Sequence, residues 1–168
     1  MRGLERPQRL STPKQGYAGV GVAMKPAEAQ AFVRRLKDEV INQKDPEAAS
    51  RFFASDFSTL NPIPGRAPGL PGLKVALREF FDAFPDIHET VHEVVAEGDS
   101  ICLASSIRAT HAGTFIGVPA TGRRVEFNVF EIYHLKGGKV ASAWVFFDGL
   151  AYLGQVGAPP GGGPALTK

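Results

Sequence analysis

The 168-residue chain has a single cysteine, no long hydrophobic run and no large excess of charge of either sign. Cys102 cannot form a disulfide within the chain, and its apolar neighbourhood is typical of a small core residue. No apolar run approaches the roughly 20 residues that a membrane-spanning helix needs. The 19 basic and 17 acidic residues form no basic stripe with interleaved aromatics. The sequence therefore predicts one globular domain with neither nucleic-acid nor membrane partners.

The two ends of the chain differ from its centre. Residues 1–24 lack the apolar core of a signal peptide, so we expect a cytoplasmic location. They are basic, as in a weak targeting segment, but a flexible tail fits them better. Residues 158–168 hold too much glycine and proline to form a core and are predicted to be disordered. Residues 25–157 are then the folded domain.

The first half of this domain has helical periodicity. Apolar residues recur at spacings of three and four over 26–42, which predicts an amphipathic helix. A second, short helix is expected over 47–53. The proline- and glycine-rich segment 61–72 predicts a loop, and helical spacing returns over 73–84 until Pro85 ends it.

The second half has the composition of strands separated by glycine turns. Gly137-Gly138 is a typical hairpin turn. Residues 149–157 are expected to form a short closing helix or turn. Helices followed by a run of antiparallel strands predict an α+β fold. The four expected strands are His88–Glu97, Ser100–His111, Arg123–Leu135 and Lys139–Phe147.

His88-Glu89-Thr90-Val91-His92 matches the zinc motif HExxH. That motif binds zinc only on a helix, where both histidines share one face. Pro85 precedes it and the turn at Gly98 follows, which favours a strand with both histidines on its solvent face. No metal site is therefore expected.

Several short sequence motifs between Phe84 and Gly157 carry a family resemblance: FPD, AEGD, THAG, GVPATGRR, GGKV and FFDGL. Together with their order, they resemble the SnoaL-like polyketide cyclase family of the nuclear transport factor 2-like superfamily. The resemblance covers residues from about 26 to 157. It implies a cone-shaped, curved, mostly antiparallel sheet around an apolar pocket, which N-terminal helices close. It implies no cofactor.

The resemblance also implies a site. Family members commonly carry an HWD-like sequence motif on the last strand, and the aspartate of this motif is the general acid/base. This chain has Val145 at that position and keeps a second aspartate, Asp148. Because valine cannot carry a proton, either Asp148 or Glu131 has taken over or the reaction is not performed. Asp148 could instead cap the final turn, and Glu131 could instead face solvent.

The family resemblance, together with strand alternation, implies the remaining candidates. His111 matches a family histidine beside the pocket, although a structural role at the strand end fits it equally. Asn61 matches a polar pocket residue. The residues expected to line the pocket and bind substrate are Asn61, Phe127, Val129, Tyr133, Val145 and Phe147, with Asp148, Glu131 and His111 as catalytic candidates.

The implied function is a cofactor-free enzyme that acts on a hydrophobic carbonyl compound of polyketide or terpenoid type. A carboxylate would drive cyclisation or isomerisation by proton transfer, as in polyketide cyclases, ester cyclases and isomerases of secondary metabolism. The alternatives are a small-molecule-binding or accessory protein without catalysis, and an epoxide hydrolase, for which Asp148 and Arg108 are the only hints. Phe130, Ile132, Trp144 and Phe146 would form an apolar outer sheet face, which predicts a homodimer through that face.

Overall fold

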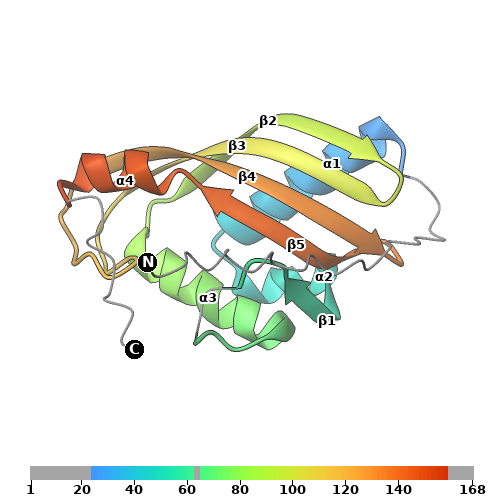
Figure 1. Cartoon of the computed structure of the whole chain (residues 1–168), viewed down its shortest axis with the longest axis horizontal. Helices are drawn as coiled ribbons and strands as arrows, with labels where there is room; N and C mark the ends of the chain where they lie inside the picture. Colours follow the sequence, from blue (N-terminus) through green and yellow to red (C-terminus); the bar gives the residue numbers. More distant parts are fainter. Residues whose placement is uncertain (1–23, 63–64, 159–168) are drawn as a thin grey trace, which may run out of the picture.

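The computed structural model describes residues 24–62 and 65–158 (Figure 1). The predicted flexible segments therefore lie outside the described residues, except for Met24 and Ala158. They stay predictions.

Helix α1 (Pro26–Leu36) continues without a break into a π-helical turn, η1 (Lys37–Asn42). Together they span the first predicted helix. The Glu28 carboxylate accepts a hydrogen bond from the Lys25 backbone N–H at 3.2 Å, which satisfies one of the free donors at the helix start. Apolar side chains at helical spacing turn inward and are buried, namely Ala29, Val33, Leu36 and Val40.

Five strands form one sheet in the order β1-β5-β4-β3-β2. All neighbours are antiparallel except β1 and β5, which are parallel. The predicted α+β class is confirmed. The strands are β1 (Phe53–Thr59), β2 (His88–Glu97), β3 (Ser100–Thr110), β4 (Arg124–Lys136) and β5 (Lys139–Phe147).

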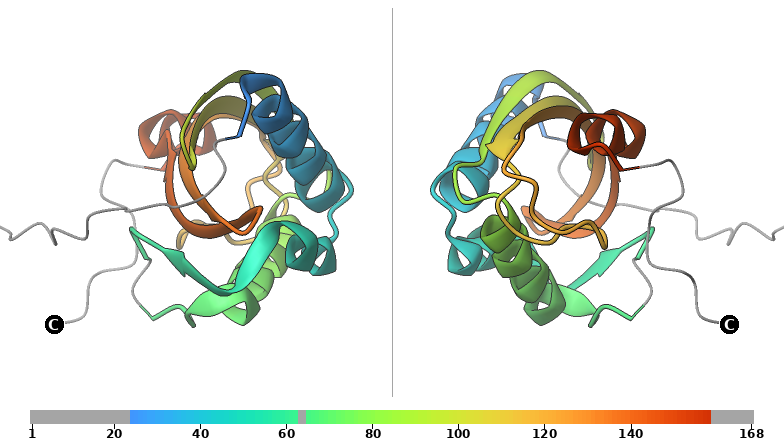
Figure 2. Two further views of the ribbon diagram at one scale, coloured as in Figure 1. Left: turned by 90° about the vertical axis from the view of Figure 1, so that its right-hand side faces the viewer. Right: turned by 90° about the vertical axis from the view of Figure 1, so that its left-hand side faces the viewer.

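The sheet curls, and α1 and α3 (Gly69–Ala83) lie along its open side (Figure 2). The core fills the space between the concave face of the sheet and these helices. A short 3-10 turn, η2 (Pro46–Ala48), and α2 (Ala49–Phe52) lead into β1, while α4 (Gly149–Val156) follows β5. No helix in the described ranges is long and apolar enough to cross a bilayer.

Two elements differ from the sequence-based expectation. Residues 53–59 form the edge strand β1, where only the end of a short helix was expected. Helix α3 begins at Gly69, inside the predicted loop 61–72. Pro71 is tolerated there because the first turn of a helix does not use its backbone N–H groups.

Register shifts in two strand pairs change which side chains face the interior. In β5 the register shifts after Leu135↔Val140, so Val140 and Ala143 are both buried, whereas simple alternation would turn Ala141 inward instead of Val140. In β2 the register shifts between Val91 and Glu93, which makes His92 the extra residue of a bulge.

Candidate functional site

Charged side chains that come from both halves of the chain meet on the concave face of the sheet. The Lys37 ammonium lies between two carboxylates: it binds Glu131 and is 2.9 Å from Glu89 Oε1. The Ser105 hydroxyl donates to the same Glu89 oxygen at 2.6 Å. The side chains are nearly enclosed, with exposed fractions of 5% for Lys37, 2% for Glu89 and 9% for Glu131. We call Lys37, Glu89, Ser105, Glu131 and Tyr133 the buried ion cluster.

Four elements hold the buried ion cluster in place. Glu89, Ser105 and Glu131 come from β2, β3 and β4, and Lys37 is the first residue of the π-helical turn. At the other end of that turn, the Asn42 amide accepts from the Glu89 backbone N–H at 2.8 Å and donates to its carbonyl at 3.2 Å. Both ends of η1 are thus bound to Glu89, which fixes Lys37 against the sheet.

The charges explain the protonation of the cluster. Burial alone would lower the pKa of Lys37, but attraction to Glu131 and Glu89 overrides it and raises the pKa well above its usual value. Lys37 therefore remains an ammonium and is no free amine nucleophile. Burial raises the pKa of Glu131 more than Lys37 lowers it, and Glu89 adds to the rise. Burial and Glu131 also raise the pKa of Tyr133.

Glu131 lies directly opposite Val145 across the β4–β5 pair. Cross-strand partners have Cβ atoms about 5 Å apart. Val145 and Phe147 are 38% and 37% exposed, while Ala143, two residues before Val145, is 1% exposed. The concave face is therefore accessible beside Glu131, at the position where the family resemblance places the missing aspartate.

His111 belongs to a separate buried group. Its Nε2 is 3.0 Å from the Tyr152 hydroxyl and its Nδ1 is 3.0 Å from the Thr121 hydroxyl. Its backbone N–H donates to Arg123 O, and its carbonyl accepts from Thr121 and Gly122. Burial lowers the pKa of His111, so the ring is neutral near pH 7. The surrounding rings are Phe84, Phe115, Phe127, Phe147 and Tyr152.

The remaining candidates have mainly backbone partners. The Asp148 carboxylate accepts from Ala151 N at 2.9 Å and so caps α4, as the alternative interpretation of this residue expected. Asn61 donates to Val145 O at 2.6 Å and accepts from Val145 N at 3.0 Å. Phe127, Val129 and Tyr133 are buried in the core.

The HExxH segment lies on β2, and both of its histidines are exposed. His92 is 2.8 Å from the Ser106 hydroxyl. Within the described part of the chain, no group of three or more His, Cys, Asp or Glu side chains has an arrangement that could hold a metal ion. Glu89, the glutamate of the motif, belongs instead to the buried ion cluster.

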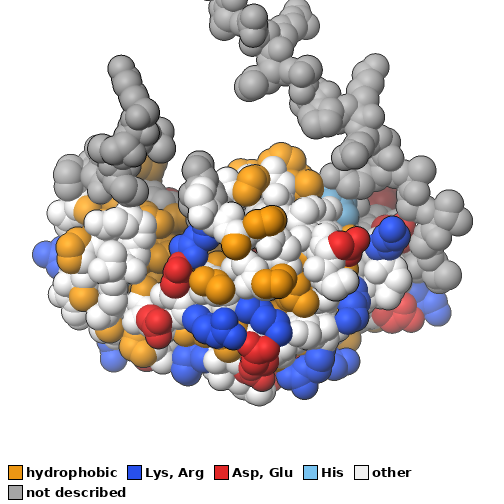
Figure 3. All heavy atoms as spheres, turned by 90° about the horizontal axis from the view of Figure 1, so that it is seen from below, with side chains coloured by type: hydrophobic (Ala, Val, Ile, Leu, Met, Phe, Trp, Pro, Cys, Tyr) orange, Lys and Arg blue, Asp and Glu red, His pale blue; other side chains and the backbone are white. Residues whose placement is uncertain are grey.

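Two depressions lie outside the concave face. One of about 460 Å³ lies where α3 meets β1, on the face that carries basic side chains beside apolar ones in Figure 3. It contains none of the candidates; Lys74 and Arg78, which line it, both pair with Glu47. The other, of about 210 Å³, lies between η1 and the edge strand β2 and is partly lined by Lys37 and Glu89.

Solved structures share this architecture. TsrD from Streptomyces laurentii is 24% identical with a TM-score of 0.74, over 81% of this chain and 99% of its own. IdmH from Streptomyces antibioticus is 25% identical with a TM-score of 0.65, over 78% and 99%. A SnoaL-like polyketide cyclase from Agrobacterium tumefaciens is 21% identical with a TM-score of 0.67, over 79% and 99%. Curated proteins gave no match.

A curved sheet that two helices close, with buried carboxylates on its concave face, defines a cone-shaped protein of the nuclear transport factor 2-like class. Residues 31–156 match the SnoaL-like polyketide cyclase family. The chain belongs to that family.

Sequence reasoning found Glu131 but missed its partners Lys37, Glu89 and Ser105. A signal for two of them was present. Lys37 lies four residues after Val33 and three before Val40, on the apolar face of the helix, and Glu89 alternates with the apolar Ile87 and Val91. A charged residue in an apolar periodic position indicates a buried partner.

Proposed function

We propose that the protein is a cofactor-free enzyme that transfers protons on a hydrophobic, carbonyl-bearing small molecule of polyketide or terpenoid type. Glu131 is the acid/base group, and the reaction is a cyclisation or isomerisation through an enolate. The observation that carries the proposal is the pairing of Glu131 with Val145. The last strand, β5, lacks a carboxylate at Val145. Glu131 supplies one from the neighbouring strand β4, because cross-strand partners have Cβ atoms about 5 Å apart.

The electrostatics support a base in this position. Because burial raises the pKa of Glu131, the ionised carboxylate is a stronger base than an exposed one. Lys37 and Tyr133 interact with the same carboxylate and hold it in place. A ligand on the accessible surface at Val145 and Phe147 would lie against apolar walls beside Glu131.

Asp148 is the weaker candidate because its carboxylate is engaged in the cap of α4. The epoxide hydrolase alternative loses its second hint, since Arg108 pairs with Glu126 at 3.1 Å, and both side chains are exposed. The cytoplasmic location and a role in secondary metabolism stay predictions.

The test is hydrogen–deuterium exchange at the α-carbon of enolisable ketones and esters in D2O, followed by NMR. We expect Glu131→Gln to lower the exchange rate by about 10²- to 10⁴-fold, the usual contribution of a general base. Glu126→Gln, an exposed glutamate on the same strand, is the matched control and should retain the rate.

Asp148→Asn decides between the two carboxylates. If this variant loses exchange and Glu131→Gln does not, the base is misassigned. If the wild-type protein binds members of the panel and exchanges none of them, the non-catalytic binding role replaces the enzymatic one.

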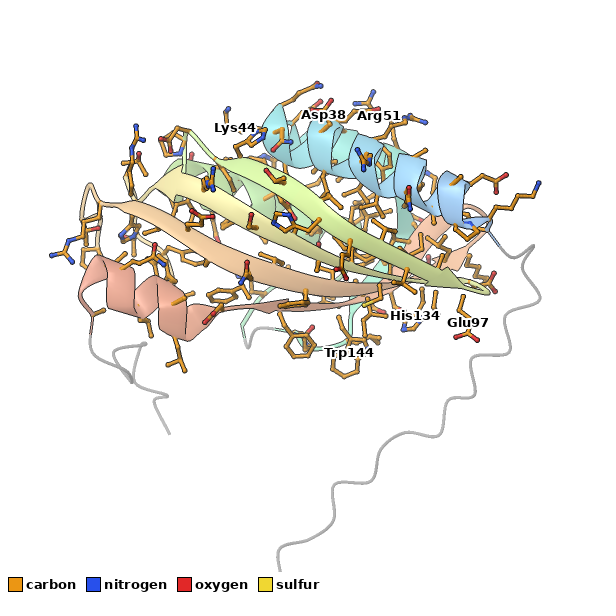
Figure 4. The ribbon with its side chains drawn as sticks, turned by 90° about the horizontal axis from the view of Figure 1, so that it is seen from above. Asp38, Lys44, Arg51, Glu97, His134 and Trp144 are labelled. Carbon is orange, nitrogen blue, oxygen red and sulfur yellow. The ribbon has the colours of Figure 1, made fainter. Side chains whose placement is uncertain are left out.

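We also propose a homodimer through the outer face of the sheet. Trp144 points away from α1 (Figure 4), and its ring stacks on Phe146 with centroids 6.0 Å apart. Phe130 pairs with Phe146 and Ile132 with Trp144, so the four side chains form one patch, and all four are exposed. An apolar patch of this kind on a sheet is typical of an interface between proteins.

Trp144→Glu should convert a dimer of twice 18.0 kDa to a monomer. The two-fold axis of a homodimer places the new carboxylate of each copy within the same apolar interface, where it is desolvated. Sedimentation velocity measures the mass. Val75→Glu makes the same change at an exposed apolar residue of α3 and should leave the dimer intact. A wild-type monomer at all concentrations would contradict the proposal.

A further inference from the structure

The buried ion cluster lies close to the surface on two sides of the molecule. On one side Glu131 opposes Val145, where the concave face is exposed. On the other side lies the 210 Å³ depression between η1 and β2, which we call the edge depression. Its lining includes Lys37 and Glu89 themselves, together with Arg34, Asn42, His88 and Thr90.

The edge depression exists because β2 is the last strand of the sheet. In place of a further strand, the Asn42 amide pairs with the backbone of Glu89. One side chain thus covers only a short part of the edge. Lys37 and Glu89 line this depression, so both side chains border it on the side away from Val145.

Hydrogen-bonding groups connect the two sides without a gap. Lys37 Nζ contacts a carboxylate oxygen of Glu131 and, at 2.9 Å, one of Glu89. Ser105 Oγ donates to that Glu89 oxygen, and Tyr133 interacts with Glu131. Lys37 of η1 and Tyr133 of β4 therefore interact with Glu131 directly, while Glu89 of β2 is joined to it through Lys37 and Ser105 of β3 binds Glu89.

We propose that Lys37 and Glu89 form a proton route between Glu131 and water in the edge depression, separate from the ligand face at Val145. The inference rests on the proposed role of Glu131 as a base. A base that takes a proton must lose it again before the next turnover. A ligand over Val145 and Phe147 would cover the direct path from Glu131 to water, whereas the edge depression would stay open.

The proton balance closes at each step. Glu131 takes a proton from the substrate carbon, and the electron pair of that C–H bond stays on the substrate as the enolate. Lys37 gives one of its protons to Glu89, and the amine that this leaves then takes the proton of Glu131, so that Lys37 is an ammonium again. Glu89 releases the proton to water in the edge depression. The net charge of the cluster changes from minus one to zero and back.

The test follows the protonation of Glu131 itself after a pH jump and needs no substrate, because it is made in Val145→Trp, whose indole covers the direct path from Glu131 to water as a ligand would. Time-resolved infrared spectroscopy detects the carbonyl band of a protonated carboxyl group, and the band that Glu131→Gln removes belongs to Glu131. We expect Glu89→Gln to slow the appearance of this band by about tenfold or more, equivalent to about 1.4 kcal/mol of barrier. Glutamine keeps acceptor oxygen for Lys37 and Ser105 but cannot carry the proton onward.

Two further variants separate the sides of the molecule. Thr90→Trp covers the edge depression from an exposed position of β2 and should slow the band even if Glu89→Gln fails to fold. In the protein that keeps Val145 the direct path is open, so Thr90→Trp should slow the appearance of the band less.

A band that appears equally fast in Val145→Trp with and without Thr90→Trp overturns the proposal. So do equal rates in all variants, or a wild-type protein without a Glu131 band at any pH at which it is folded. The exchange assay on ketones and esters reports separately on the proposed base. If Glu131→Gln has no effect in the exchange assay but the infrared band of Glu131 still appears fast, the proposed function is contradicted. The proton route is not contradicted by that result.

Discussion

Replacing Lys37 by methionine is expected to lower the free energy of unfolding by about 3–5 kcal/mol. The substitution removes the ammonium between Glu89 and Glu131 but leaves both carboxylates buried. Methionine fills most of the same space, so the loss comes from uncompensated charge and not from a cavity. Urea denaturation of the wild-type and variant proteins at pH 7 measures the difference.

The pH dependence of this variant has a definite sign. In the wild-type protein the pKa of Glu131 is already raised above 4.5, mainly by burial, so protonation of Glu131 favours the folded state. Without Lys37 the attraction that stabilises the ionised carboxylate is gone, and the pKa of Glu131 rises further. The stability of the variant should be highest below about pH 4.5, the pKa of Glu131 in the unfolded chain. It should fall as the pH rises through the pKa of Glu131 in the folded protein. The deficit of Lys37→Met is thus expected to shrink in acid.

A matched triple variant tests the cause. Lys37→Met combined with Glu89→Gln and Glu131→Gln removes all three charges with little change in volume, and should recover most of the lost stability. Recovery would identify buried charge as the cause. A single-variant loss below about 1 kcal/mol at pH 7 would contradict a tight ion cluster and indicate that water reaches the carboxylates.

The fold was predictable where the periodicity is strong. Predicted strands β2 to β5 agree with the structure within a residue or so, because glycine turns separate long apolar stretches. Strand β1 (Phe53–Thr59) was missed because Ser55, Asp56 and Ser58 interrupt its apolar pattern. Within the described residues it is an edge strand that pairs with β5, so the tertiary pairing and not the local sequence determines it.

The candidate site was predictable only in part. Alternation placed Glu131 on the same face as Phe127 and Tyr133, and all three are buried. Its pairing with Val145 depends on the register shift between His134 and Leu135, which no local pattern reveals. Lys37 and Glu89 are distant in sequence from Glu131, and only the folded sheet brings the three together.

A second large loss of unfolding free energy is expected for a substitution at Phe84, where α3 ends. Phe84 is fully buried, and its ring contacts join α3 to the loop after β3, to β4 and to α4. Phe84→Ala is expected to cost about 3–5 kcal/mol of unfolding free energy, from lost burial and from the cavity left behind. Denaturation in urea measures it. The rings around Phe84 are those of Phe80, His111, Phe115, Phe127 and Tyr152.

This variant also probes how the interior of the cone is filled. Phe127 and the His111–Tyr152 pair occupy the half of the interior near α4, so the proposed ligand is expected at the side of Val145. Removing the Phe84 ring should open an apolar space in that filled half, and benzene should bind there and restore part of the stability. Val75→Ala, at an exposed position of α3, should change stability by less than about 0.5 kcal/mol. If benzene has no effect on Phe84→Ala, the surrounding rings have collapsed into the space. The interior is then adaptable enough for a ligand to displace its aromatic side chains.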